Sequence, residues 1–234
     1  MVKEDEMVIA RSATLRSQVA DELRKDIIEG RYAPGNRLIE RDLSERYDVS
    51  RTVIREALRV MEAESLVVVE PYRGPSVKAL SLAEITHLYE VREILESAAC
   101  GLAAERADAD QFASISNTLE NIATADAADI DARVGFGNAF YESIVEAANN
   151  PLIGTLLSNV QTQISQLRRV TLSTPGREID LLTELRPIVD AIKQGDRGGA
   201  EKAASRHVRA AAEIARNVLT DRINGPATAT ASGG

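Results

Sequence analysis

The sequence has no tryptophan, one cysteine and two histidines, and aromatic side chains make up 3% of its 234 residues. The single cysteine, Cys100, cannot form an intrachain disulfide, so nothing indicates a secreted disulfide framework. No apolar run approaches the roughly 20 residues that span a bilayer, and the acidic start MVKEDEMVIA does not resemble a signal peptide. We therefore expect a cytoplasmic protein without a membrane partner.

An excess of positive charge is also missing, because the formal net charge is -8. The charge is uneven along the chain: residues 11–80 hold 13 Lys and Arg against 12 Asp and Glu, whereas residues 81–234 hold 14 against 21. The acidic second part is a poor candidate for a phosphate-binding surface. Any basic patch in the first part must come from the arrangement of its arginines on the fold.

Hydrophobic residues make up 44% of the chain and are mainly Ala, Leu, Ile and Val. This composition favours helices packed on helices over an aromatic-rich sandwich of strands. In the first part, apolar residues at helical spacing predict short helices over 15–29, 38–47 and 51–64. Pro34-Gly35 predicts a turn, and Ser50 is a suitable N-cap for the third helix.

A β-hairpin is predicted after these helices. The β-branched run LVVVE (66–70) and the segment VKAL (77–80) flank the turn sequence PYRGPS. Three short helices followed by a hairpin are the layout of a winged helix-turn-helix, in which the third helix enters the major groove of DNA.

Three arginines follow one stripe of the third predicted helix. Its core face would consist of residues at helical spacing, namely Ile54, Ala57, Leu58 and Met61. Arg51, Thr52 and Arg55 would then be exposed near the helix N-terminus, where guanidinium groups can reach phosphates and guanine edges. The alternative is a solvated charged face. Arg59 lies one turn deeper and is as compatible with a phosphate contact or a structural salt bridge as with a contact to a base.

From Ser81 onward the pattern is entirely helical, beginning with a capping box at Ser81 and Glu84. We expect a mainly α protein in which this part is an all-α antiparallel bundle, with helices over 82–106, 110–125, 128–148, 151–172, 177–194 and 197–223. The predicted domains are a winged helix-turn-helix over 10–79, a helical domain over 80–223 and a disordered tail over 224–234.

The first part resembles the DNA-binding domain of GntR-family bacterial transcription regulators. The resemblance lies in the "EGRYAPGNRL" turn, the "DLSERYDVSRT" core with its following "REAL", and the "YRGPSV" wing. It implies contacts to operator DNA from Arg41, Ser50, Arg51, Thr52, Arg55, Arg73 and Gly74. Two positions depart from the family pattern: Val53 stands where many members have Pro, and Ser65 replaces a common Gly, which requires an unfavourable backbone angle.

The second part resembles the effector-binding and dimerisation domain of the FadR subgroup, called FCD. The matching segments are "HLYEVREILESAACGLAAERA", "FYESIVEAANNPLI", "LRPIVDAIKQGD" and "ASRHVRAA". Many such bundles bind a divalent metal through one Asp and three His. Here the resemblance places Gly137, Tyr141, Leu185 and His207 at those four positions. We therefore expect no metal and no cofactor; the alternative is a residual metal held by the His207 imidazole together with carboxylates from other, unaligned positions.

Without a metal, the cavity should be roomier and less polar. The resemblance implies an effector site lined by Arg92, Gly137, Tyr141, Asn150, Leu185 and His207. Since a buried arginine favours an anion, we expect a carboxylate-bearing or partly apolar organic effector. In the alternatives, Arg92 pairs with Glu96 or Glu142, and Asn150 only caps a helix.

These features predict a homodimeric, effector-responsive transcription regulator that binds an inverted repeat on double-stranded DNA, most often as a repressor in this family. Two alternatives remain at this point. The bundle could be an unliganded remnant on a DNA-binding protein, or the cavity could belong to an enzyme. Against an enzyme, the sequence contains no nucleophile-base constellation and no phosphate-binding loop.

Overall fold

The computed structural model describes residues 2–126, 128–174 and 177–224. These residues form two compact units that divide between Leu80 and Ser81, apart from Ser158–Gln166, which groups with the first unit. Within the described ranges, no helix is both long enough and apolar enough to cross a membrane.

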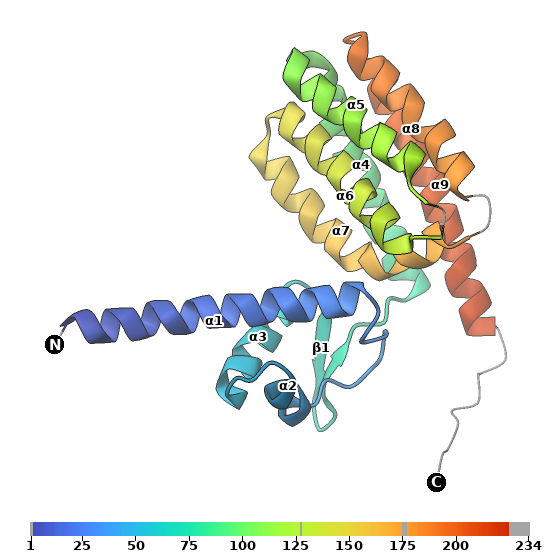
Figure 1. The fold of residues 1–234 in the computed structure, drawn as a ribbon. Helices are drawn as coiled ribbons and strands as arrows, with labels where there is room; N and C mark the ends of the chain where they lie inside the picture. Colours follow the sequence, from blue (N-terminus) through green and yellow to red (C-terminus); the bar gives the residue numbers. More distant parts are fainter. Residues whose placement is uncertain (1, 127, 175–176, 225–234) are drawn as a thin grey trace. The chain divides into compact units, whose positions relative to one another are not determined.

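The first unit contains three helices followed by a two-stranded hairpin (Figure 1): α1 (Val2–Ile28), α2 (Glu40–Arg46), α3 (Arg51–Ala63), β1 (Val67–Glu70) and β2 (Gly74–Val77). Its core joins residues from all five elements and includes Leu23, Leu43, Met61, Val67 and Val77. The predicted winged helix-turn-helix is thereby confirmed.

Helix α1 is longer than the predicted 15–29, because it begins at Val2. The segment before Leu15 contains no glycine or proline that would interrupt a helix. The prediction relied on a repeating apolar stripe, which locates only the part of a helix that packs against a core.

The second strand lies earlier than predicted, at Gly74–Val77 instead of 77–80. The strands pair antiparallel with Val67 opposite Val77 and Val69 opposite Pro75. Proline has no N–H to donate, but its carbonyl oxygen can still accept a hydrogen bond. Here the Leu38 N–H donates to the Pro75 carbonyl at 2.9 Å. A strand was not expected through "GPS" because glycine and proline usually mark turns.

Ser65, which precedes β1, has φ 59°, and this agrees with the unfavourable backbone angle predicted at this position.

A buried aspartate connects α1 to the region of α2. Asp26 is almost fully buried and accepts from Arg31 Nε at 2.8 Å, Arg46 Nη2 at 2.9 Å and Tyr47 Oη at 2.8 Å. Because every one of these donors approaches the same carboxylate, Asp26 fixes the start of the helix-turn-helix on the end of α1.

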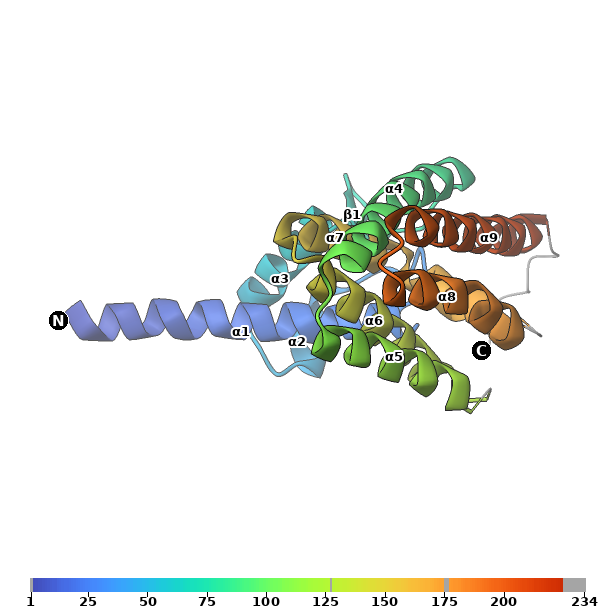
Figure 2. The ribbon, with the colours of Figure 1, turned by 90° about the horizontal axis from the view of Figure 1, so that it is seen from above.

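The second part of the chain forms six helices in the described residues (Figures 1 and 2): α4 (Leu82–Arg106), α5 (Ala109–Thr124), α6 (Ile130–Ala148), α7 (Pro151–Leu172), α8 (Arg177–Lys193) and α9 (Arg197–Asn224). All of them belong to the second unit except the middle of α7, Ser158–Gln166. Helix α4 packs against α6, α8 and α9, and α5 packs against α6 and α8. The all-helical prediction is confirmed, and the bounds agree to within two residues. Asn224, predicted as the first tail residue, closes α9, while 225–234 lie outside the described residues.

Local capping fixes several of these helix boundaries. The Ser81–Glu84 capping box is present, and Asp108 with Gln111 forms a second one at the start of α5. Between α6 and α7, Asn149 adopts a left-handed conformation with φ 48°. The side-chain oxygen of Asn150 then accepts from the Ile153 N–H at 3.3 Å. The chain reverses here in two residues, which sets α7 antiparallel to α6.

Candidate functional site

The predicted DNA-contacting residues of α3 gather at its exposed N-terminal end. Ser50 Oγ accepts from the Val53 N–H at 3.4 Å and caps the helix. The predicted core face is buried (Ile54, Ala57, Leu58 and Met61). Arg51, Thr52 and Arg55 are consequently turned to solvent beside the positive end of the helix dipole.

Most arginines on this surface already contact a carboxylate. Arg55 Nε donates to both carboxylate oxygens of Glu40, at 3.0 and 2.9 Å, and these hydrogen bonds raise the pKa of Arg55. Arg41 pairs with Asp42, and Arg59 pairs with Glu56 at 2.6 Å. Arg51 forms no hydrogen bond or ion pair within the described part of the chain. Among the predicted DNA-contacting arginines of α3, Arg51 is therefore the one whose guanidinium has no partner in the described residues.

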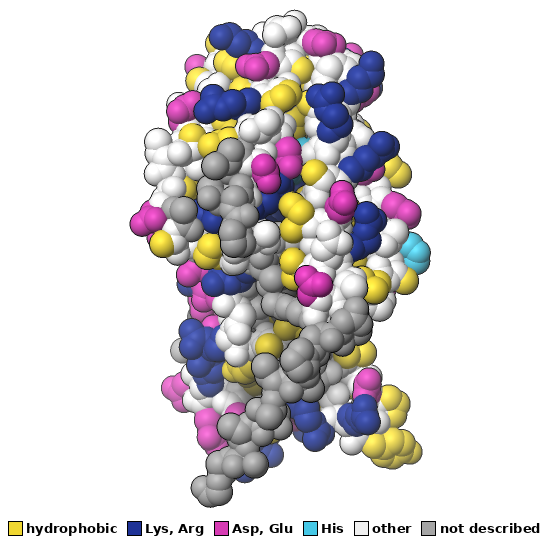
Figure 3. Space-filling view, turned by 90° about the vertical axis from the view of Figure 1, so that its right-hand side faces the viewer, with side chains coloured by type: hydrophobic (Ala, Val, Ile, Leu, Met, Phe, Trp, Pro, Cys, Tyr) yellow, Lys and Arg dark blue, Asp and Glu magenta, His cyan; other side chains and the backbone are white. Residues whose placement is uncertain are grey.

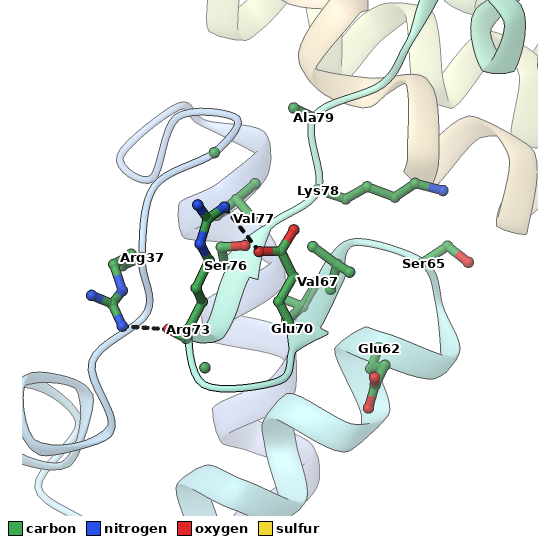
Figure 4. A pocket seen from close by; sticks show the side chains of 13 residues that line it. Arg37, Glu62, Ser65, Val67, Glu70, Arg73, Ser76, Val77, Lys78 and Ala79 are labelled. Atoms are coloured by element: carbon green, nitrogen blue, oxygen red, sulfur yellow. Dashed lines mark hydrogen bonds and ion pairs between the residues drawn. The ribbon is translucent and has the colours of Figure 1, made fainter.

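The wing carries a second arginine at its tip. Arg73 is strongly exposed, and its Nη1 contacts Glu70 Oε2 at 3.3 Å across the hairpin (Figure 4). Gly74 follows with φ 76°, which lets the loop reverse before β2. A surface hollow of about 740 Å³ lies against this hairpin.

Arg37 was not predicted as part of this surface. It donates to the Arg73 carbonyl, and its backbone bridges to Ser76 of β2 (Figure 4). In the sequence, Arg37 is recognisable only as a residue that follows the Pro34-Gly35 turn. No local pattern indicates that residues 35–38 pair with the wing.

In the bundle, a cavity of about 40 Å³ is lined by residues from every helix from α4 to α9. Its lining includes the predicted Arg92, Gly137, Tyr141, Leu185 and His207. A Cβ atom added to Gly137 would meet no other atom within 4 Å, so space continues on that side. Asn150 does not line the cavity; its side chain caps α7.

A chain of buried polar side chains runs along this cavity. Arg92 Nε donates to Glu96 Oε1 at 2.6 Å, and Arg92 Nη2 donates to Tyr141 Oη at 3.1 Å. Tyr141 Oη lies 2.5 Å from His207 Nε2, and His207 Nδ1 lies 2.8 Å from Glu184 Oε2. The pairing of Arg92 with Glu96, one of the alternatives from the sequence, is therefore present.

The protonation states follow from this geometry. Burial raises the pKa of the Tyr141 hydroxyl, so it remains protonated and donates to His207 Nε2. Burial lowers the pKa of His207 despite the Glu184 hydrogen bond, which makes the neutral ring the stable form. Its single proton lies on Nδ1 and is donated to Glu184. Although burial opposes it, hydrogen bonds from His207 and Arg177 lower the pKa of Glu184 to about 2.

Arg168 enters the same cavity from α7 and was not predicted. Its side chain is 9% exposed, and its guanidinium carbon lies 5.4 Å from the centre of the Tyr141 ring. It donates to the side-chain oxygen of Asn138, while its Nη2 atom is buried without a hydrogen-bond partner. Burial, and then repulsion from Arg92, lower the pKa of Arg168. In the sequence, the pair Arg168-Arg169 looks like ordinary solvated charge.

Arg177 and Glu184 were also missed by the sequence analysis. Arg177 donates through Nη1 and Nη2 to the two oxygens of Glu184, at 2.7 and 2.8 Å. Their spacing of seven residues on one helix is too common to mark a buried pair without knowledge of the packing.

The residues at the four metal positions do not form a metal site. Gly137 and Leu185 provide no ligand atom, and both ring nitrogens of His207 are engaged by Tyr141 and Glu184. Among the described residues, no group of three or more His, Cys, Asp and Glu side chains could hold a metal ion.

Charge on the molecular surface is mixed. On the face drawn in Figure 3, Lys and Arg side chains are interspersed with Asp and Glu. The DNA-contacting candidates thus depend on local placement on α3 and the wing, in agreement with the net charge of -8.

Comparison with known families and proteins agrees with both units. Residues 15–77 match the family of bacterial regulatory proteins called gntR, and residues 87–210 match the FCD domain. The chain is 30% identical over 210 residues to the galactonate operon transcriptional repressor of Escherichia coli, covering 78% of this chain and 88% of that one. It is 24% identical to the transcriptional repressor RspR of Escherichia coli, covering 87% of this chain and 90% of the relative.

Two solved structures share the fold. McbR/YncC of Escherichia coli aligns with a TM-score of 0.77 at 21% identity, over 88% of this chain and 98% of that chain. A structure described as a GntR transcriptional regulator from Rhodococcus sp. RHA1 aligns with a TM-score of 0.70 at 26% identity, over 85% and 96%. The chain therefore belongs to the GntR family, as a DNA-binding transcriptional regulator of the FadR-like subgroup with an FCD domain, and it is not an enzyme.

Proposed function

We propose that this regulator is a homodimeric repressor that binds an inverted-repeat operator and is released by a small organic ligand in the bundle cavity. The observation that carries the DNA part is the exposed N-terminal end of α3, where an unpaired Arg51 lies beside the helix dipole. The proposed DNA contacts are Arg41, Ser50, Arg51, Thr52, Arg55, Arg73 and Gly74.

Repression is supported by the names of two similar proteins, the galactonate operon repressor and RspR.

An inverted repeat would match the two-fold symmetry of a homodimer, with half-sites about one helical turn apart. Val91 and Ile94 lie three residues apart on α4 and are both exposed, at 46% and 69%. A second copy of the chain would cover this apolar strip.

The proposed dimer can be tested by the molar mass of the chain in solution. The wild-type chain should sediment as a dimer, and Ile94→Glu should sediment as a monomer, because the substitution places a charge in the proposed interface. Leu152→Glu is the control, since Leu152 is similarly exposed on α7 at 68%. A wild-type monomer would contradict the proposal.

The effector part is supported by the cavity, which gathers Arg92, Gly137, Tyr141, Leu185 and His207 in one place. The Tyr141 and His207 side chains, which hydrogen-bond to each other, form a polar part of the wall, while Gly137 and Leu185 leave an apolar part. A carboxylate-bearing ligand fits a site walled by arginines. Ligand binding would favour one arrangement of the DNA-binding units over another and so change the affinity for DNA.

The effector can be sought by calorimetric titration of the full chain with fractionated metabolite pools. An active pool should also displace the chain from an operator fragment recovered by selection. Tyr141→Phe and Arg92→Ala should both weaken the response, since each removes part of the buried polar chain. An unchanged effector affinity in both variants would remove these residues from the site. If no pool binds or stabilises the chain, the bundle is an unliganded remnant and the effector proposal fails.

A further inference from the structure

Four arginines line the cavity, namely Arg92, Arg133, Arg168 and Arg177, and Arg168 differs from Arg92 and Arg177 in its partners. Arg92 is paired with Glu96, and Arg177 is paired with Glu184. Arg168 has no carboxylate partner in the described ranges of the chain; its contacts are the neutral amide of Asn138 and the ring face of Tyr141. Its buried Nη2 has no hydrogen-bond partner among the described residues.

A buried cation in this state is unfavourable for folding. An unpaired charge and an unused donor each carry a desolvation penalty, and nearby Arg92 adds repulsion. Replacing such a charge by an apolar side chain of similar size is often neutral or stabilising. An anion that reached Nη2 would remove both penalties at once.

We propose that Arg168 is the residue that anchors the anionic group of the effector. The inference rests on the proposed effector site and assigns its principal charge contact to Arg168 instead of Arg92. The Arg92 guanidinium is already satisfied by Glu96 and Tyr141, so it contributes mainly to the position of the Tyr141 hydroxyl.

The size of the cavity limits the ligand. A volume of about 40 Å³ corresponds to about three water-sized sites, which is the size of one carboxylate group. The space that continues beside Gly137 leaves room for a short apolar or hydroxylated extension. The ligand class is therefore a small monocarboxylate.

The probes are sodium acetate, propionate and butyrate, compared with the corresponding neutral amides at constant ionic strength. The readout is the thermal unfolding midpoint of the full chain, followed by circular dichroism. Carboxylates should raise the midpoint with concentration, because they bind only the folded state, and amides should not. If no carboxylate stabilises the wild-type chain, the proposal is wrong.

Arg168→Met provides the decisive variant. It should unfold at or above the wild-type midpoint without ligand and should lose the carboxylate response. Arg169→Met is the matched control, because Arg169 is the next residue in the chain and pairs with Asp131 at the surface. This variant should keep the carboxylate response. A full carboxylate response in Arg168→Met would overturn the proposal.

A second variant covers the case in which Arg168→Met does not fold. Arg168→Lys keeps the charge but loses the planar fork, so carboxylate should bind about tenfold or more weakly. Wild-type affinity in this variant would contradict the proposal. A neutral metabolite could instead release both the wild-type chain and Arg168→Met from DNA equally well. This result would refute the role of Arg168 as the anion contact but would leave the effector-responsive function intact.

Discussion

Arg55 on the recognition helix donates one N–H to both carboxylate oxygens of Glu40, at 3.0 and 2.9 Å. In the absence of DNA, one of the two arginines best placed to contact it is thus already neutralised by an acid from α2. If Arg55 contacts DNA as proposed, Glu40 would have two separable effects: it would compete with phosphate for Arg55, and it would hold the guanidinium in one orientation.

The first prediction concerns this competition. Glu40→Gln should bind random duplex DNA more tightly than wild type, because Arg55 becomes available to phosphate. The slope of log K against log salt should become steeper by about 0.9, the value for one additional neutralised phosphate. Titrations of fluorescent random duplex at several salt concentrations measure both quantities.

The control for this prediction is Glu45→Gln, which removes a carboxylate from the same helix at 4.0 Å from Arg41. It should change the slope less than Glu40→Gln does. Identical affinity and slope for Glu40→Gln and wild type would show that Glu40 does not restrain Arg55 in solution.

The second prediction separates the arginines of α3. Arg51→Ala should weaken operator binding by roughly 1–3 kcal/mol if Arg51 reads a base, and should affect random DNA less. Arg59→Ala should have a smaller effect on operator preference, since Arg59 lies one turn deeper and pairs with Glu56. An equal loss on operator and random DNA would make Arg51 a phosphate contact.

The third prediction concerns Asp26, which joins α1 to Arg31, Arg46 and Tyr47. Asp26→Asn should reduce the free energy of unfolding of the DNA-binding unit by about 2–4 kcal/mol, because it leaves buried donors poorly matched. Urea denaturation measures the loss. Glu29→Gln serves as a surface control, since it removes only a weak pair with Lys25 at 3.9 Å. Equal stability of the two variants would refute the structural role of Asp26.

The fourth prediction is a pH dependence of bundle stability. The pKa of His207 lies below its ordinary value of 6.5 in the folded chain, so the unfolded chain takes up this proton first. Its contribution to stability should therefore fall as the pH drops below about 6.5. Since the pKa of Glu184 is lowered from 4.5 to about 2, its contribution is lost separately, below about pH 4.5.

Urea titrations between pH 8 and pH 5 isolate the histidine. His207→Gln should be less stable than wild type at pH 8, and the difference should shrink as the pH falls. If the two chains lose stability in parallel over this range, His207 is not the titrating group.

Much of the fold follows from local signals in the sequence. The capping box at Ser81 and the Asn150-Pro151 pair fix the starts of α4 and α7, and the apolar spacing of α3 fixes which face carries Arg51 and Arg55. Local signals were insufficient where tertiary pairing decides the structure. Strand β2 includes Gly74 and Pro75 because residues 35–38 and β1 lie beside it, which no local pattern encodes.

The cavity was predicted only in part. Five of the six proposed effector residues line it, because the resemblance placed them on the inner faces of known helices. Asn150 does not, since its position at a helix start engages its side chain in capping. Arg168 could not be distinguished from Arg169 in the sequence, because burial of the first and partial exposure of the second depend on how α7 packs.

The most direct test of the account is the selection of DNA by the full chain from a random duplex library. We predict enrichment of an inverted repeat whose half-site centres lie about 10 base pairs, or a multiple, apart, and loss of this preference in Arg51→Ala. Enrichment of no sequence, or the same preference in Arg51→Ala, would contradict the assignment of α3 as the reading element.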